Sequence, residues 1–162
     1  MQSGWPEPVE RVASFLRAAG AEARLEQLEE RAPSARQAAE AIGCALDQIV
    51  KSLVLVCDGA PVLALVPGDR RGDAGKIARA AGAGGATIAP PGRVLALTGF
   101  EPGAVAPFPL PLVERVLIEH TLLAHAVVWV GGGSEQHLVR LAPTELLRLT
   151  RAAVADLVQE PA

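Results

Sequence analysis

The sequence predicts one compact α/β (α+β) domain that spans residues 1–162, with a mixed, curved β-sheet flanked by helices. Half of the 162 residues are apolar, which is enough to bury a core in a single domain of this length. Segments with helical spacing alternate along the chain with β-branched segments, and several neighbouring strand candidates are close enough to form hairpins. Hairpins interspersed with helices indicate a sheet that is mixed and not wholly parallel.

The first part of the chain predicts a helix, a strand and a second helix. Apolar residues recur at helical spacing over residues 6–19, whereas residues 21–28 alternate small or apolar side chains with charged ones, as in a half-exposed strand. Ser34 and Gln37 form a capping-box pattern, because the two residue types can satisfy each other's backbone amides at a helix start. A helix is therefore expected over residues 35–42.

The middle of the chain predicts a hairpin followed by two short helices. Residues 49–57, IVKSLVLVC, are β-branched and apolar almost throughout, which is typical of a central strand. The Asp58-Gly59 pair then favours a tight turn into a partner strand over residues 62–66. Short helices are expected over residues 73–81 and 92–97.

The last part of the chain begins with residues 99–111, which are too rich in glycine and proline for a helix or strand and predict an ordered loop. The remaining expectations are strands over residues 113–118, 126–130 and 137–141, a glycine-rich turn at Gly131–Ser134, an amphipathic helix over 143–150 and a last helical turn or two within 152–159.

Charge and composition exclude several classes of function. The formal charge is −3 and the chain has five aromatic residues, so neither sequence-blind adhesion to phosphate backbones nor base stacking on exposed rings is expected. A local exception is a basic stretch that is either a solvated face or a small phosphate-binding patch; its members are Arg70, Arg71, Lys76, Arg79 and Arg93.

Membrane, disulfide and metal signals are missing from the sequence. No signal-peptide pattern and no apolar stretch of about 20 residues occurs, so a cytoplasmic protein with no membrane contact is expected. Cys44 and Cys57 lie in apolar contexts and are interpreted as reduced core thiols. The histidines have no metal-ligand spacing, so no metal or cofactor is expected.

Lys51 is the most unusual residue of the chain, because strand alternation places it on the same face as Ile49, Leu53 and Leu55. One interpretation is a lysine at a strand mouth, with its stem on apolar surface and its ammonium in water. The other is an ammonium at the edge of a cleft, placed to meet a phosphate, a carbonyl oxygen or a carboxylate. The residues alone leave both interpretations open.

Two glycine-bearing segments are candidate walls of a ligand site. The loop over residues 99–107, GFEPGAVAP, has small residues that let a ligand approach the backbone, and its amides can point at a developing oxyanion. Gly131–Ser134 has the same properties, and a plain surface crossover is the alternative for each segment. Since no nucleophile motif is present, a hydrolase built on this chain would work by positioning and electrostatics.

These same residues resemble the YbaK/ProX family of aminoacyl-tRNA deacylases, which includes the editing insertion of some prolyl-tRNA synthetases. The resemblance runs in order over nearly the whole chain and is specific as a set. The segments that carry it are ERVASFLRAAGAEARLEQL, QAAEAIGCALDQIVKSLVLV, VPGDRRGDAGKIARAAG, LTGFEPGAVAPF, VVWVGGGSEQHLVRLAPTELLRLT and AVADL.

The resemblance implies hydrolysis of the ester between an amino acid and the 3′-terminal ribose of tRNA, with no metal or organic cofactor. A small residue such as cysteine or alanine on proline tRNA is the expected substrate, and the partners are the 3′ acceptor end of aminoacyl-tRNA and, as a second expectation, an aminoacyl-tRNA synthetase. The implied catalytic residue is Lys51. The implied substrate-binding residues are Gly99, Phe100, Gly103, Ala104, Val105, Ala106, Pro107, Gly131, Gly132, Gly133 and Ser134.

The sequence departs from the commonest family pattern at three positions. Ala104 replaces the second of two adjacent glycines, Ala106 replaces a frequent Ser or Thr, and Pro109 replaces a glycine. The methyl group of Ala104 is expected to narrow the pocket or restrict the backbone, and Ala106 removes one polar contact. These changes keep a second hypothesis open, in which the domain binds an aminoacyl group or nucleotide without turnover, and a third, in which it docks on a synthetase.

Overall fold

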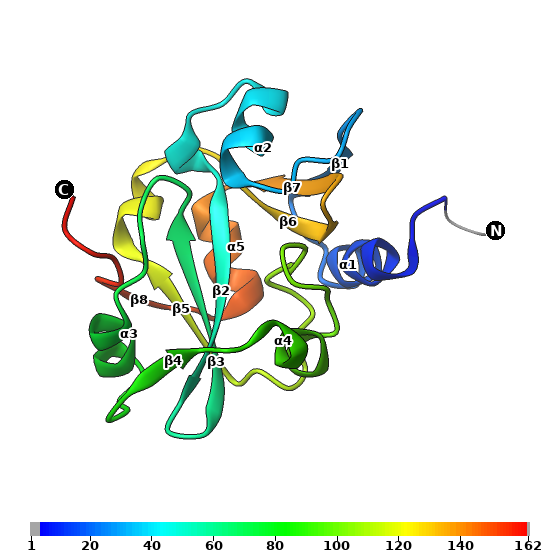
Figure 1. Ribbon diagram of the computed structural model, residues 1–162. Helices are drawn as coiled ribbons and strands as arrows, with labels where there is room; N and C mark the ends of the chain where they lie inside the picture. Colours follow the sequence, from blue (N-terminus) through cyan, green and yellow to red (C-terminus); the bar gives the residue numbers. More distant parts are fainter. Residues whose placement is uncertain (1–3, 162) are drawn as a thin grey trace.

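The computed structural model describes residues 4–161, in which helices pack around two β-sheets (Figure 1). In chain order the elements are α1 (Glu7–Ala18), β1 (Ala23–Gln27), α2 (Ala35–Ile42), the 3-10 helix η1 (Leu46–Gln48), β2 (Val50–Cys57), β3 (Ala60–Pro67), α3 (Ala74–Ala80), β4 (Ala86–Ile88), α4 (Pro91–Thr98), β5 (Arg115–Glu119), the 3-10 helix η2 (His120–Ala124), β6 (Val128–Ser134), β7 (His137–Leu141), α5 (Pro143–Thr150) and β8 (Ala153–Ala155).

The larger sheet is mixed, as the sequence predicts, and has the strand order β4-β2-β3-β5-β8. Strand β2 pairs antiparallel with β3 and β4, whereas β5 runs parallel to both β3 and β8. A second sheet, which the sequence does not distinguish from the first, is wholly antiparallel with the order β1-β7-β6. A parallel bridge between Ile49 and Trp129 joins the start of β2 to this smaller sheet.

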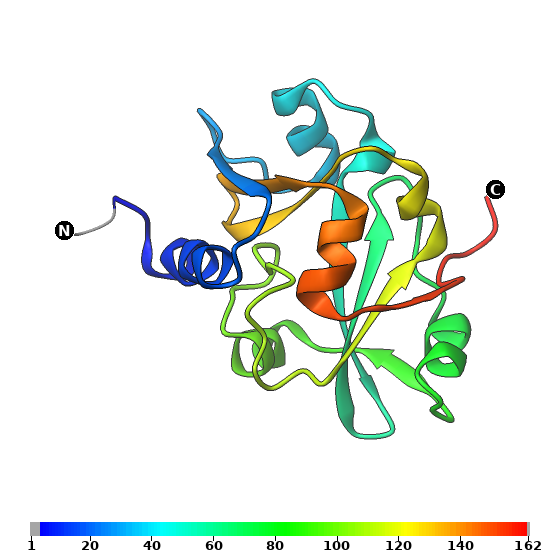
Figure 2. The same cartoon turned by 180° about the vertical axis from the view of Figure 1, so that it is seen from behind.

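The main core lies between the two sheets, and a second core lies under α3. Strand β3 contributes to both, because Leu63 and Leu65 belong to the first cluster while Val62, Ala64 and Val66 belong to the second. Burial on both faces explains why this strand is apolar without alternation. Figure 2 shows α5 crossing one face of the larger sheet, and Figure 1 shows α1 lying beside β6.

The predicted helix signals act as expected. Ser34 caps α2, since its hydroxyl accepts a hydrogen bond from the Gln37 amide at 3.1 Å. Gly43 ends the helix in the left-handed conformation, with φ at +81°. The Ser34 cap fixes the start of α2, and both Ser34 and Ala35 line the pocket described below.

Two expectations for the last third of the chain are wrong. Gly131–Ser134 is not a turn but the end of β6, with an irregular register between Gly131 and Ser134, so the turn falls at residues 135–136. Residues 152–159 form no helix; Ala153–Ala155 is strand β8, which pairs with β5 and covers an edge of the larger sheet. Tertiary pairing overrides the helical tendency of this alanine-containing segment.

Among residues 4–161, no helix is long and apolar enough to cross a membrane.

Candidate functional site

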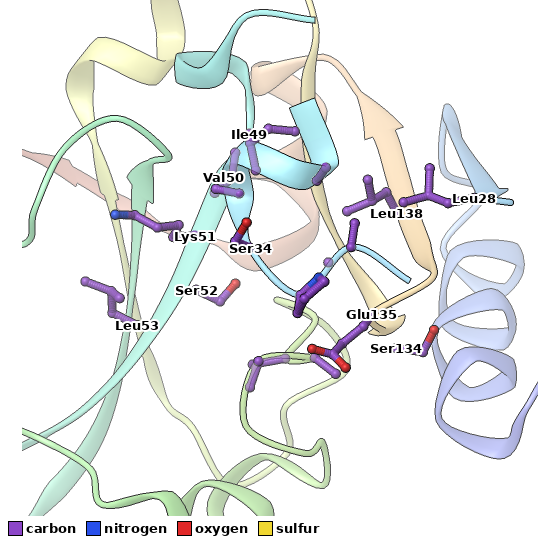
Figure 3. A pocket seen from close by; sticks show the side chains of 18 residues that line it. Leu28, Ser34, Ile49, Val50, Lys51, Ser52, Leu53, Ser134, Glu135 and Leu138 are labelled. Carbon is purple, nitrogen blue, oxygen red and sulfur yellow. The ribbon is translucent and has the colours of Figure 1, made fainter. Parts of the chain in front are cut away.

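A pocket of about 420 Å³ lies where the start of β2, the loop after α4 and the end of β6 come together (Figure 3). A further wall of the pocket comes from the segment that leads into α2 and from the start of that helix. The lining residues are Leu28, Ala32, Pro33, Ser34, Ala35, Ala38, Ile49, Val50, Lys51, Ser52, Leu53, Gly103, Ala104, Val105, Gly131, Ser134, Glu135 and Leu138. Small and apolar side chains predominate, so the shape of the wall is set largely by backbone.

Strand β2 presents its two faces to different surroundings. Val50 and Val54 pack in the core cluster that also holds Val105 of the loop, and Ser52 lies between them on the same face by strand alternation. Figure 3 shows the Ser52 side chain on the Glu135 side of the strand. Its Oγ is buried and, among the described residues, has no hydrogen-bond partner. Ser52 therefore has spare hydrogen-bonding capacity at the pocket.

Lys51 lines the pocket wall, but its ammonium is directed elsewhere. The Nζ atom donates a hydrogen bond to the backbone carbonyl of Arg70 at 2.6 Å, and Figure 3 shows the side chain on the opposite side of β2 from Ser52. Burial lowers the pKa of Lys51, the nearby Asp69 carboxylate opposes that shift, and Arg71 adds to it. The charge therefore faces the Arg70–Arg71 loop and does not converge with the glycine-bearing segments in this structure.

The loop that follows α4 is anchored from behind by α1. Gly99 ends α4 with φ at +77° and its carbonyl accepts a hydrogen bond from Arg11. The Arg11 guanidinium also lies 4.7 Å from the centre of the fully buried Phe100 ring. These contacts fix the start of the loop, so that Gly103, Ala104 and Val105 reach the pocket as a defined wall.

The turn at Gly103–Val105 leaves backbone amides available. Gly103 has φ at +82°, a conformation that favours glycine, and the Ala104 amide is taken by the Glu101 carbonyl at 3.0 Å. Within the part of the chain that the structure describes, the amides of Gly103 and Val105 have no acceptor among backbone or side-chain groups. Free amides on a small-residue wall are suited to stabilise negative charge on a bound carbonyl oxygen.

The opposite wall, at the end of β6, touches this turn directly. A Cβ atom added to Gly131 would lie 2.5 Å from the Val105 carbonyl oxygen, so only glycine allows this approach. Gly132 and Gly133 serve a different purpose, because added Cβ atoms would meet the backbone of His137 and of Pro8 at 2.8 and 2.9 Å. The absence of side chains at Gly132 and Gly133 therefore lets other backbone segments pack closely against the end of β6.

Ser134 and His137 form a hydrogen-bonded pair at the end of this wall. The Oγ and Nδ1 atoms are 2.6 Å apart, within hydrogen-bond distance, and Oγ also accepts a hydrogen bond from the Gln136 amide. Burial lowers the pKa of His137, which favours the neutral ring. Figure 3 shows the Ser134 hydroxyl directed toward α1 and not toward Glu135, so the pair fastens the β6–β7 turn.

The predicted site residues divide into two groups. Those that line the pocket are Lys51, Gly103, Ala104, Val105, Gly131 and Ser134. The others do not line it: Gly99, Phe100, Ala106, Pro107, Gly132 and Gly133. Phe100 and Ala106 are fully buried in the core, which is why they hold the wall from behind and face no ligand.

Sequence reasoning missed two polar residues of the pocket, Ser52 and Glu135. Strand alternation placed Ser52 opposite Lys51, but no pattern told which face of β2 the loop would cover. Glu135 occupies the turn after β6, and its Oε1 pairs with the Arg31 guanidinium at 2.5 Å. This pair joins two segments that are 104 residues apart.

The described residues contain one group with metal-ligand proximity, and it lies away from the pocket. Glu119, His120 and Asp156 have ligand atoms within 4.8 Å of one another. The buried Glu119 carboxylate already accepts hydrogen bonds from Thr121 and from the Leu157 amide. These donors account for both of its oxygens without an ion.

A mixed-sheet domain with a small, largely apolar pocket whose wall carries unpaired amides has the features of a site for a compact, polar-ended ligand group. The sequence profile of the aminoacyl-tRNA editing domain matches residues 29–149. The chain therefore belongs to this family, the YbaK/ProX family of editing deacylases, which confirms the expectation from the sequence.

Relatives include complete synthetases and small single proteins. The chain is 37% identical over 94 residues to a proline–tRNA ligase of Nitratidesulfovibrio vulgaris, where the match spans 58% of this chain but only 16% of the ligase. It is 34% identical to the YwhH protein of Bacillus subtilis over 74% of this chain and 76% of that protein. A candidate Cys-tRNA(Pro)/Cys-tRNA(Cys) deacylase of Enterococcus faecalis, EbsC, is 27% identical over 76% of each chain.

Solved structures confirm the fold. A candidate trans-editing enzyme for prolyl-tRNA synthetase matches with a TM-score of 0.90 and 36% identity, covering 97% of this chain and 100% of that one. The hypothetical protein APE2540 matches with a TM-score of 0.86 and 30% identity, covering 92% and 99% of the two chains.

Proposed function

We propose that this domain is a trans-editing deacylase that hydrolyses a small, wrongly attached amino acid from the 3′ end of tRNA, with cysteine or alanine on proline tRNA as the first candidates. Family membership supports aminoacyl-tRNA as the substrate. The observation that carries the proposal is the contact of two backbone walls, at Gly103–Val105 and Gly131, around a cavity of about 420 Å³ that suits a small aminoacyl group.

The reaction needs no covalent intermediate on the protein. Water adds to the ester carbonyl carbon, the carbonyl oxygen becomes an oxyanion, and the bond to the ribose oxygen then breaks. The proton released by water ends on that ribose oxygen, so the products are the free amino acid and uncharged tRNA. The free amides of Gly103 and Val105 are the proposed oxyanion donors, and the neighbouring ribose hydroxyl or a substrate thiol is the proposed proton carrier.

Lys51 has the role of a cation for the terminal nucleotide in this proposal. Its ammonium bonds the Arg70 backbone carbonyl and lies close enough to Arg71 to feel its charge, so a phosphate bound there would meet two cationic groups, Lys51 and Arg71, with the Asp69 carboxylate nearby. A lysine that exchanges its hydrogen bond with the Arg70 carbonyl for one with a phosphate contributes mainly to binding.

A panel of mischarged tRNAs tests the function. Wild-type protein is expected to deacylate at least one of cysteinyl- and alanyl-tRNA(Pro) and to leave prolyl-tRNA(Pro) intact. Lys51→Ala is expected to raise KM more than it lowers kcat, and Lys51→Arg is expected to restore part of the lost affinity. Full activity of Lys51→Ala would remove Lys51 from the mechanism, and inactivity of the wild type on the whole panel would remove the proposed function.

One observation favours a second candidate, a binding module without turnover. The Lys51 ammonium is engaged by the Arg70 carbonyl and not by the pocket, as in a strand-mouth lysine with no catalytic part. Thermal stabilisation of the protein by aminoacyl-adenosine analogues without any release of amino acid from tRNA would favour this candidate.

A further inference from the structure

Charge is distributed unevenly around the pocket. Of the residues that line it, only Lys51 and Glu135 carry a formal charge at neutral pH, and they come from opposite walls. The Lys51 ammonium is directed to the Arg70 carbonyl, so the charged group beside the Gly103–Val105 turn is the carboxylate of Glu135. A ligand seated against this turn therefore meets one negative group.

The Glu135 carboxylate is held in a defined orientation. Its side chain is 23% exposed, and its Oε1 is bound by the Arg31 guanidinium at 2.5 Å. The backbone on both sides of this pair is fixed too, because the Ala32 amide donates to the Glu135 carbonyl at 2.7 Å. Such a brace removes much of the rotamer freedom that a glutamate at a turn would otherwise have.

The second carboxylate oxygen remains available. Oε2 accepts no hydrogen bond from the described residues and lies 3.8 Å from the position that a Cβ on Gly103 would take. Figure 3 shows the carboxylate directed toward the loop that forms the other wall. A partly buried, oriented oxygen of this kind is suited to receive a cationic donor.

We infer that Glu135 is a specificity-determining residue that binds the free α-ammonium group of the aminoacyl ester, while Arg31 positions its carboxylate. This inference rests on the proposed deacylase function. An aminoacyl-tRNA end is charged at two places, with an ammonium beside the ester and phosphates beyond the ribose. The pocket has the complementary order, with Glu135 beside the turn that holds the free amides and Lys51 on the side away from it.

The inference separates the substrate from esters that lack the ammonium. An N-blocked or α-hydroxy ester leaves the Glu135 oxygen desolvated without a cation, and such a loss weakens binding by roughly tenfold or more for a charged group. Free aminoacyl esters are therefore distinguished from peptidyl esters by charge as well as by size.

The test compares an alanyl ester with the nearly isosteric lactyl ester on the same tRNA, in which a hydroxyl replaces the ammonium. The measured quantity is the ratio of kcat/KM for the two esters, so that their different intrinsic reactivities cancel between variants. Glu135→Gln, which keeps the shape of the side chain, is expected to lower this ratio by roughly tenfold relative to wild type. Glu30→Gln removes a charge from an exposed neighbouring position and is expected to leave the ratio unchanged.

The outcomes keep the inference apart from the proposed function. If Glu135→Gln slows both esters equally, Glu135 acts as a base or a structural brace and the inference is overturned. If wild type hydrolyses neither ester, the proposed function fails, and binding of the amide-linked alanyl-adenosine and lactyl-adenosine analogues decides the inference instead. Equal affinities of wild type and Glu135→Gln for the alanyl analogue would then overturn it.

Discussion

Replacing Gly131 by alanine tests whether the two walls of the pocket depend on each other. The new Cβ would lie 2.5 Å from the carbonyl oxygen of Val105 and 3.2 Å from its carbonyl carbon. Both are backbone atoms, so no side chain can rotate away. The walls must separate by about 0.9 Å to bring the closer contact to 3.4 Å, where ordinary van der Waals contact begins.

Two effects of different size are expected from this displacement. Overpacking of a rigid contact costs about 1–3 kcal/mol of unfolding free energy. The proposed oxyanion donors sit on the displaced turn, and a misplacement of about 1 Å reduces catalysis by about 100-fold. The fall in deacylation rate is expected to be larger than the loss of stability explains. As long as the variant is still folded at the assay temperature, unfolding does not reduce the amount of active protein, so the fall in rate reports the displaced donors.

Urea unfolding followed by the fluorescence of the buried Trp129, combined with deacylation rates on one mischarged tRNA, measures both effects. Gly92→Ala is the matched control, since nothing lies within 4 Å of its added Cβ and the residue is part of α4. It is expected to stabilise the protein by up to about 1 kcal/mol with unchanged activity. If Gly131→Ala had the same unfolding free energy and the same deacylation rate as the wild type, the close approach of the two walls would be refuted.

Three further changes are expected to have separable effects. Arg11→Met removes both the hydrogen bond to Gly99 and the cation–π contact, so a loss of about 2 kcal/mol in urea unfolding and faster hydrogen exchange in the loop after α4 are expected. Ser52→Ala removes a buried hydroxyl without a partner, so unfolding free energy is expected to stay the same or rise while kcat/KM falls. Burial alone would raise the pKa of Glu119, but the hydroxyl and amide donors around it lower that pKa below its ordinary value of 4.5. The resulting stabilisation is present above pH 4.5 and lost as pH falls through the lowered pKa, so acid unfolding of Glu119→Gln is expected to have a flatter pH dependence in that range.

The parts of the fold that the sequence predicts are those with strong local signals. The capping pattern at Ser34 and the glycine at position 43 set both ends of α2, and the Asp58-Gly59 turn sets the β2–β3 hairpin. Strand β8 has no such signal, because three residues pair only where β5 offers a free edge. The glycines of 131–133 favour a turn locally, yet they are strand residues because other backbone packs against them.

The candidate site shows the same limit at the level of single side chains. Alternation along β2 correctly separates Lys51 from Ser52, but both faces of this strand are apolar and buried. The face covered by the loop after α4 is decided by tertiary packing, through Phe100 and Arg11, and not by the strand itself. Glu135 has no local signal at all, since a glutamate in a turn is ordinary until Arg31 comes beside it.

Two of the departures from the family pattern, Ala104 and Ala106, lie in different surroundings. Ala106 is fully buried in the core, so the hydroxyl that it lacks would not have faced a ligand in this chain. Ala104 lines the pocket, and the left-handed backbone conformation falls on Gly103, so its methyl group causes no strain and instead occupies space at the wall. On the proposed function, residue 104 is therefore expected to limit the size of the accepted aminoacyl group more than residue 106 does, and its methyl group is expected to favour alanine-sized over larger side chains.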